Sequence, residues 1–460
     1  MTLLKDEYKK IITTLDVLLS SAEYDNIVQG IHLLESFDDE LLWSYYLKGI
    51  WFEKNKIYID EESTLFSLVQ DKKRQLIGFM LYTRRGKLQN QQSLSLADYT
   101  EIINLDTLDS CAELTTLDVS GCRNLTNIEA LQFCTKLQRL DLSATFVDDI
   151  GVLKYCTDLF ELHLSLTDVS DFHVLQHCTK LRTLSLDDCY SLSDFHVLRH
   201  CPELLELKLS GVKDITDLQY CTKLQKLELG IGTLTNIEVL QHCTKLTALN
   251  LFSANEISSI EPLKYCAYLT ELKLDGACIA DIPHCGLRNL RELSLSSIPN
   301  LTNLDVLQNL TSMRKLSLAY IDRLQDLHGL QKCTQLTALE LYCCKIPTDL
   351  EVLRCCTKLE SVSFIECDEF LDIDSLKFCT ELTELNLSCS EITNIHALQY
   401  CTKIRELILS DCYALTSIEG LQHCTNLTVL NLSGCVSLTN IDVLNHHPNQ
   451  AKLSIIYTEG

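Results

Sequence analysis

The sequence predicts an α/β solenoid, a stack of short parallel strands connected by short helical segments, and three observations lead to this fold class. The 460-residue chain repeats a unit of 20–23 residues over most of its length, most clearly in residues 424–444. In that copy Leu427, Leu430 and Leu432 follow an L-x-x-L-x-L pattern, and alternation along a strand puts Leu430 and Leu432 on one face. Leu438, Ile441 and Leu444 then close the unit. One unit cannot bury these side chains alone, so the copies must stack.

The register of the repeat can be counted from the residue that opens each unit. Thirteen openings are cysteine, two are leucine and one is histidine: Cys111, Cys134, Cys156, Cys178, Cys201, Cys221, Cys243, Cys266, Leu287, Leu310, Cys333, Cys356, Cys379, Cys401, Cys424 and His447. This period and strand pattern resemble the short leucine-rich repeats of internalin type. The second cysteine in copies such as 117–122 and 407–412 is similar to the cysteine-containing subclass. The resemblance implies a right-handed horseshoe, with a parallel β-sheet on the concave face and short helical or 3-10 segments on the convex face.

Two domains are expected. Leu94 and Leu96 belong to a degenerate opening unit, and Leu453 and Ile455 hold the last strand positions, so residues 91–460 form a solenoid of about 17 strands. Residues 1–86 do not follow the repeat. Helical spacing of apolar residues predicts a small all-α domain with helices near 3–19, 25–34, 41–47 and 63–82, interrupted at 57–59. We expect this domain to cap the open end of the stack; a role as a second binding module stays open.

The 24 cysteines are expected to be reduced and structural. Cysteine at the opening position is replaced by Leu287 and Leu310, so this position takes a small buried hydrophobic side chain. Six further cysteines occupy the ninth position of the unit, where the thiol can bridge the turn. So many unpaired thiols indicate a reducing compartment, the cytoplasm.

No metal and no cofactor are expected. The cysteines include adjacent pairs at 343–344 and 355–356 rather than C-x-x-C hooks, which disfavours zinc. The pairs His173/His177 and His196/His200 could approach one another to hold a metal. They also fit a column of polar and aromatic residues at the edge of the convex layer, and we favour that interpretation.

Charge limits the class of partner. The formal net charge is −24; residues 1–90 hold 12 Lys and Arg against 14 Asp and Glu, which leaves −22 for the rest of the chain. This field disfavours nucleic acid and favours a protein partner with a basic surface. The charged N-terminus does not resemble a signal peptide, and no apolar run is long enough to predict a membrane span.

The predicted function is non-catalytic protein–protein interaction by a monomer through the concave face. Ten outward-facing strand residues, acidic or large and apolar, are the predicted protein-binding residues: Glu206, Glu228, Phe252, Glu271, Asp275, Glu292, Tyr320, Glu340, Tyr342 and Ile365. No catalytic residue is predicted, because no phosphate-binding loop, nucleophile elbow or H-E-x-x-H motif is present. The alternative is an adaptor or effector, such as a ubiquitin-ligase-type substrate receptor, whose N-terminal helical domain docks a second partner.

Overall fold

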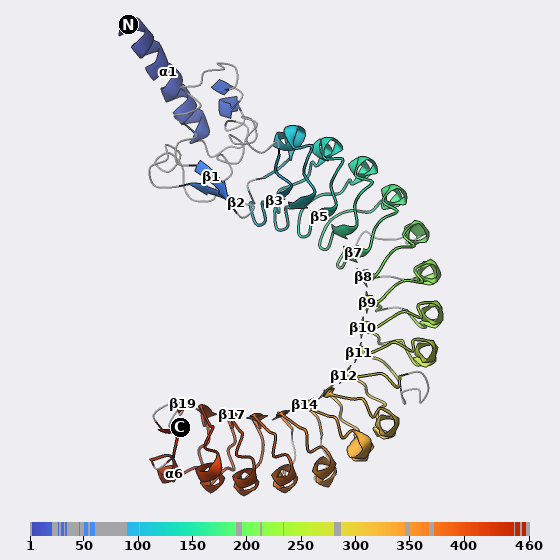
Figure 1. Cartoon of the computed structure of the whole chain (residues 1–460), viewed down its shortest axis with the longest axis vertical. Helices are drawn as coiled ribbons and strands as arrows, with labels where there is room; N and C mark the ends of the chain where they lie inside the picture. The colour runs from blue at the N-terminus through green and yellow to red at the C-terminus, as the bar shows by residue number, and fades with distance from the viewer. Residues whose placement is uncertain are drawn as a thin grey trace. The chain divides into compact units, whose positions relative to one another are not determined.

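The computed structural model describes residues 2–20, 26, 29–31, 33–34, 46, 50–53, 56–59, 90–100, 102–189, 196–211, 214–232, 234–279, 287–345, 350–367, 372–445, 447–450 and 453–456. The chain divides into two compact units, Met1–Gly211 and Val212–Gly460, which are described separately below. Figure 1 labels their helices and strands. Within the described ranges, no helix combines the length and the hydropathy that a membrane span needs.

The first unit begins with helix α1 (Thr2–Leu19), which confirms the first predicted helix. Leu15 and Leu19 on its apolar face are buried, as is Tyr46. The Tyr46 hydroxyl donates a hydrogen bond to the Asp16 carboxylate at 2.8 Å, so this buried phenol keeps a polar partner. The helix predicted over 63–82 lies outside the described residues.

The prediction that this N-terminal region is all-α is wrong, because it also contains an antiparallel hairpin. Strand β1 (Ile50–Glu53) pairs with β2 (Lys56–Ile59), with Ile50 opposite Ile59. Aromatic and β-branched residues fit a pleated surface, and the two strands are separated by two residues only. The sequence marked 57–59 only as an interruption, because the leucine spacing on either side is helical.

Parallel strands of the repeat follow in the first unit: β3 (Ser93–Ser95), β4 (Thr116–Asp118), β5 (Arg139–Asp141), β6 (Glu161–His163), β7 (Thr183–Leu186) and β8 (Glu206–Ser210). Each pairs with the next in register, for example Leu94 with Leu117 and Leu117 with Leu140. Leu94 and Leu96 are buried, which confirms the degenerate opening unit.

The second unit continues the repeat with β9 (Lys226–Gly230), β10 (Ala248–Phe252), β11 (Glu271–Asp275), β12 (Glu292–Ser296), β13 (Lys315–Ala319), β14 (Ala338–Tyr342), β15 (Ser361–Ile365), β16 (Glu384–Asn386), β17 (Glu406–Ile408), β18 (Val429–Asn431) and β19 (Ser454–Ile456). Neighbours are again parallel and in register. With the first unit this makes 17 repeat strands among the described residues, as predicted.

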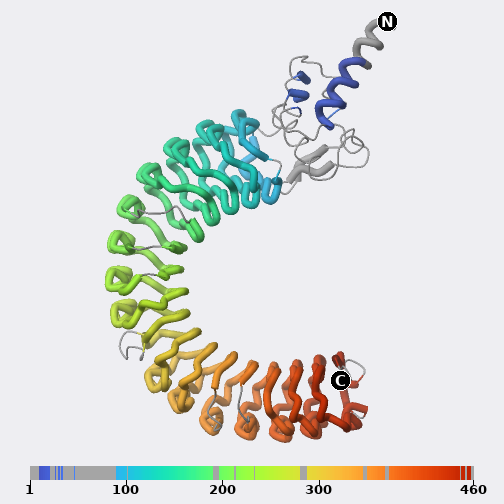
Figure 2. Tube along the Cα trace, turned by 180° about the vertical axis from the view of Figure 1, so that it is seen from behind, coloured from blue at the N-terminus to red at the C-terminus, as the bar shows by residue number. Residues whose placement is uncertain are grey.

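A short 3-10 helix lies on the side opposite the strands in most returns between strands (Figures 1 and 2). The return between β11 and β12 is not among them, because residues 280–286 lie outside the described residues. In the first unit these are η1 (Asp106–Ser110), η2 (Glu129–Phe133), η3 (Gly151–Tyr155), η4 (His173–His177) and η5 (His196–His200). The second unit has η6 (Thr216–Tyr220), η7 (Glu238–His242), η8 (Glu261–Tyr265), η9 (Asp305–Asn309), η10 (His328–Lys332), η11 (Glu351–Cys355), η12 (Asp374–Phe378), η13 (His396–Tyr400) and η14 (Glu419–His423). In the last coil, α6 (Asp442–Asn445) takes this place.

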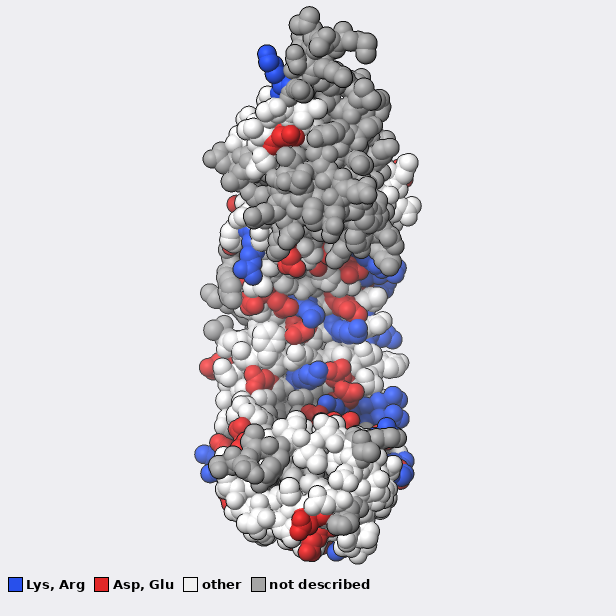
Figure 3. Space-filling model, turned by 90° about the vertical axis from the view of Figure 1, so that its left-hand side faces the viewer, with Lys and Arg blue, Asp and Glu red and all other residues white. Residues whose placement is uncertain are grey.

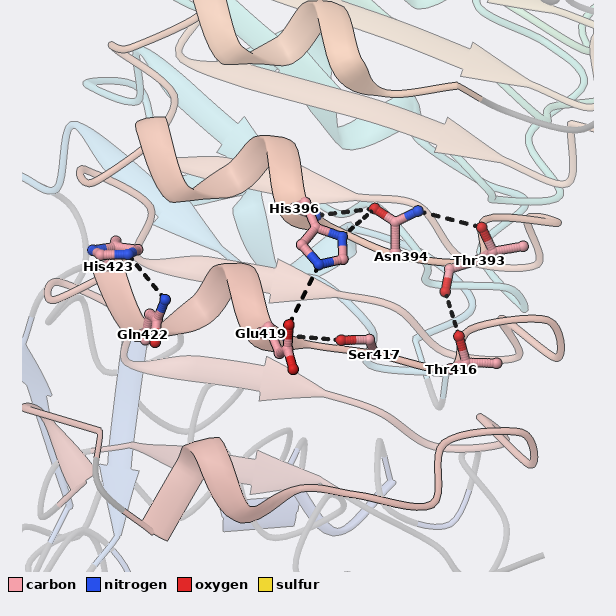
Figure 4. Close-up of polar contacts among 8 residues, drawn as sticks. All are labelled: Thr393, Asn394, His396, Thr416, Ser417, Glu419, Gln422 and His423. Carbon is pink, nitrogen blue, oxygen red and sulfur yellow. Dashed lines mark hydrogen bonds and ion pairs between the residues drawn. The ribbon is translucent and has the colours of Figure 1, made fainter.

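An Asn, Asp or Ser side chain starts most of these turns. The Asn127 carboxamide oxygen accepts from the Glu129 N–H at 2.9 Å, and Ser417 does the same for Glu419 at 3.3 Å. Short polar side chains in this role satisfy an N–H that the 3-10 helix leaves without a carbonyl partner. Figure 4 shows two such turns in neighbouring coils, where Asn394 holds the start of η13 and Ser417 the start of η14.

The core of each unit consists of the strand leucines, the closing apolar residues and the cysteines. All 13 opening cysteines are buried and none of them forms a disulfide, as predicted. The ninth-position thiols are buried too. Each donates a hydrogen bond to a backbone carbonyl of the preceding coil, that of the second leucine in its L-x-L pattern. Their distances are 3.0 Å for Cys122 to Leu96, 3.1 Å for Cys189 to Leu164, 3.5 Å for Cys344 to Leu318, 3.8 Å for Cys367 to Leu341, 3.1 Å for Cys412 to Leu387 and 3.0 Å for Cys435 to Leu409. The thiol was predicted to bridge the turn, and these bonds instead connect it to the preceding coil.

The last coil differs from the prediction in two ways. Ile455 pairs with Leu430, whereas the repeat count placed Leu453 there, so this coil is two residues longer than expected. Ile441 is 38% exposed rather than buried. The corresponding residues of the two preceding coils, Ile395 and Ile418, are buried.

Candidate protein-binding face

The strand face of the second unit holds nine of the ten predicted binding residues; Glu206 lies in β8 of the first unit. We use "strand face" for the outward side chains of β9–β15 together with the residue that follows each strand. Because side chains alternate along a strand, the leucines point into the core and the residues between them stay at least partly accessible.

Charges of both signs are interspersed on the strand face. From β9 to β15 the outward strand positions carry Glu228, Glu271, Asp275, Glu292 and Glu340 against Lys226, Lys273 and Lys315. Figure 3 shows acidic and basic side chains in the same rows rather than in separate fields. The face is therefore only slightly acidic, and most of the net charge lies elsewhere on the molecule.

Several of these charges are paired. Lys273 lies 2.7 Å from Glu271, and Lys315 lies 2.7 Å from Glu340 on the next strand. The hydrogen bond to Glu271, followed by the charges of Glu271, Glu292 and Glu228, raises the pKa of Lys273, so this lysine stays protonated. The pairs are solvent-exposed, and such pairs stabilise a fold by about 0–1 kcal/mol.

The structure brings three of the predicted apolar anchors together. The rings of Tyr320 and Tyr342 meet edge to face, with centroids 5.3 Å apart and planes at 89°. Ile365 is the neighbour of Tyr342 in the β14–β15 register. Phe252 does not join them, because it ends β10, four strands away from β14. Hydrogen bonding to Tyr320, and then Cys343 and the charge of Glu366, raise the pKa of Tyr342.

Cys343 and Glu366 complete this cluster, and the sequence did not single them out. The Cys343 thiol donates to the Glu366 carboxylate at 2.9 Å. Partial burial and this bond raise the pKa of Cys343 to about 11, so the thiol stays protonated at neutral pH. Cys343 stands two residues after Leu341, and Glu366 two residues after Phe364, the second inward-facing residue of its strand. Other coils have glycine at this position, namely Gly121, Gly276 and Gly434. That recurrence of glycine was the signal available in the sequence.

Two histidines of the 3-10 helices, on the side of the coils opposite the strands (the turn side), contact neighbouring polar side chains. His396 Nδ1 lies 2.7 Å from the Asn394 carboxamide oxygen, and His396 Nε2 lies 3.5 Å from the Glu419 carboxylate of the next coil (Figure 4). His173 lies 2.8 Å from Asp171 in the equivalent arrangement. Over the ranges that the structure describes, no three His, Cys, Asp or Glu side chains are placed to hold a metal ion.

Comparison with known proteins gives the same fold. Residues 340–450 match the family model described as BspA type leucine rich repeat region, in 6 copies. No curated protein matches. The functional domain of InlJ from Listeria monocytogenes, described as including a cysteine ladder, is 20% identical over 75% of this chain and 74% of that chain, with a TM-score of 0.58. A leucine-rich repeat protein of Leptospira interrogans is 16% identical over 81% of this chain and 97% of that chain, also with a TM-score of 0.58. The chain therefore has the leucine-rich repeat solenoid fold, and its residues 340–450 are similar to the BspA type of repeat.

Proposed function

We propose that this protein is a non-catalytic scaffold that binds a partner protein through the strand face. Leucine-rich repeat proteins are generally protein-interaction scaffolds, and solenoids bind through their extended surfaces. The observation that carries the proposal is the exposed pair Tyr320 and Tyr342, which are 51% and 36% exposed among polar neighbours. Exposed tyrosines of this kind are typical anchors of protein interfaces.

The proposal includes a partner with a basic surface, a monomeric scaffold and a cytoplasmic location. The excess of carboxylates on the strand face supports the first of these. The location is supported by the 23 cysteines that the structure describes, none of which forms a disulfide and 19 of which are buried. A chain with so many closely stacked thiols suits a reducing compartment.

A pull-down with matched variants tests this function. The strand-face variant combines Tyr342→Ser with Glu292→Lys, and the control combines Tyr400→Ser with Glu351→Lys on the turn side, where both side chains are exposed. Each is compared with the wild type, at equal folded concentration, in a lysate of the cells that make the protein. We expect the wild type and the control to retain the same partner, and the strand-face variant to lose at least about tenfold of it. Equal retention by all three proteins, or equal loss by both variants, would contradict the proposal.

A further inference from the structure

One residue of nearly every coil, within three residues after the end of the strand, adopts a left-handed backbone conformation. In the second unit this rim column comprises Ser253, Gly276, Ser297, Tyr320, Cys343, Glu366, Cys389, Asp411 and Gly434, with φ between 47° and 79°. The conformation lets the residue bond to the next coil. The N–H of Tyr320 donates to the Tyr342 carbonyl at 2.9 Å, and that of Gly276 donates to the Ser296 carbonyl at the same distance.

Glycine meets this backbone requirement without a side chain, as Gly276 and Gly434 show. A bulky residue with positive φ is a conformational outlier, because its Cβ crowds the backbone. Tyr320, Cys343, Glu366 and Cys389 nevertheless fill four successive positions of the rim column. Strained backbone that bears exposed side chains is a recurrent feature of functional sites.

The rim column carries negative charge where these side chains gather. From Ser253 to Gly434 it contains Glu366 and Asp411 and no lysine or arginine. The hydrogen-bond partner of Glu366 is the neutral thiol of Cys343, and no ion pair joins Glu366 to any lysine or arginine that the structure describes. The face of an aromatic ring beside an uncompensated carboxylate attracts a cation.

We propose that Tyr320, Tyr342 and Glu366 form a subsite for an arginine side chain on an extended segment of the partner protein. This inference rests on the proposed function and specifies the chemistry of the same face. A guanidinium is planar, so it can stack on a tyrosine ring while donating two hydrogen bonds to a carboxylate. The ammonium of lysine cannot do both with the same geometry. A phosphate or another anion is disfavoured by Glu366.

Peptide binding to the full-length chain tests the subsite. The probe is a fluorescein-labelled twelve-residue Gly/Ser peptide with three arginines, and matched peptides carry citrulline or lysine at the same positions. Fluorescence anisotropy is measured at low ionic strength. We expect the arginine peptide to bind at least about fivefold more tightly than the citrulline peptide, and more tightly than the lysine peptide. Equal binding of the arginine and citrulline peptides overturns the inference.

Three variants locate the binding and separate it from a structural role. Tyr320→Gly and Glu366→Gln are each expected to weaken arginine-peptide binding at least about fivefold. Because glycine suits positive φ, Tyr320→Gly should also keep the Tm or raise it by about 1–3 °C. Ala144→Gly, at the equivalent left-handed position of a coil in the first unit and outside the strand face, is the control and should leave binding unchanged. A lower Tm of Tyr320→Gly with unchanged binding overturns the subsite. If the pull-down still distinguishes strand face from turn side while arginine gives no selectivity, this inference fails and the proposed function stands.

Discussion

At the scale of single residues, the buried cysteines have two structural roles in the stack of coils. The opening cysteines fill small spaces in the core, and burial raises the pKa of Cys243 to about 12 and that of Cys178 to about 11. The ninth-position thiols add a directed contact between coils, as from Cys435 to the Leu409 carbonyl at 3.0 Å. The thiol is a weak donor, but it adds a hydrogen bond to the interface between neighbouring repeats. The stability of a solenoid depends on these interfaces.

Replacing Cys435 tests that contact. Cys435→Ala removes the donor and leaves a small void, so the free energy of unfolding should fall by about 1–2 kcal/mol. Cys435→Asn supplies an amide that can reach the same carbonyl and should retain more stability than alanine. Urea unfolding followed by circular dichroism measures both. Cys389→Ala is the control, because Cys389 is exposed, and its effect should stay within about 0.5 kcal/mol. An alanine variant as stable as the wild type would show that the Cys435 contact contributes nothing.

At the scale of elements, spacing between coils is set at the second residue of each 3-10 turn. This residue is alanine or valine in several coils, such as Ala130 and Val306, but Gly329 in η10. A Cβ on Gly329 would overlap the backbone carbonyl of Leu304 in the preceding coil. The turns η9 and η10 therefore approach more closely than a side chain at this position allows.

Gly329→Ala should accordingly lower the free energy of unfolding by about 1–3 kcal/mol, since the clash is with backbone and cannot be relieved by a rotamer change. Gly232→Ala is the matched control. Nothing lies within 4 Å of its added Cβ and its φ is not positive, so it should be neutral or slightly stabilising. Differential scanning calorimetry of the two variants decides the point, and equal Tm values for both would refute the close approach.

The strands and turns could be predicted from the sequence because the same leucine spacing recurs in every coil, so an error in one coil is corrected by the others. Features that occur once had no such support. The hairpin β1–β2 lies outside the repeat, and the two-residue shift that pairs Ile455 with Leu430 occurs in the last coil only. The cluster of Tyr320, Tyr342 and Glu366 depends on a backbone conformation that leucine spacing does not report. Phe252 was grouped with these residues because alternation predicts which face a residue occupies, but not which exposed residues meet.

At the scale of the whole molecule, stability depends on contacts between neighbouring coils rather than on one central core. The exposed pairs that join successive coils, such as Lys136 with Glu113 and Lys403 with Glu381, contribute little individually. The negative charge of the chain opposes compaction. The buried leucines and thiols within each unit must therefore supply most of the free energy of folding.

The reactivity of the cysteines measures how well each unit encloses this buried core. The thiolate is the form of cysteine that attacks iodoacetamide and displaces its iodide. At pH 8 a buried thiol of pKa about 12 is ionised only to the order of 1 in 10,000. Of the 23 described cysteines, we expect the exposed Cys278 and Cys389 to react first, then Cys343 and Cys355, and the 19 buried ones only after urea is added. Partial burial and the charge of Asp411 raise the pKa of Cys389, so its rate should increase steeply between pH 7 and pH 9. Mass spectrometry of peptides from a timed reaction measures each site. Modification of Cys243 or Cys178 in native protein as fast as that of Cys278 would mean that the coils do not enclose their thiols.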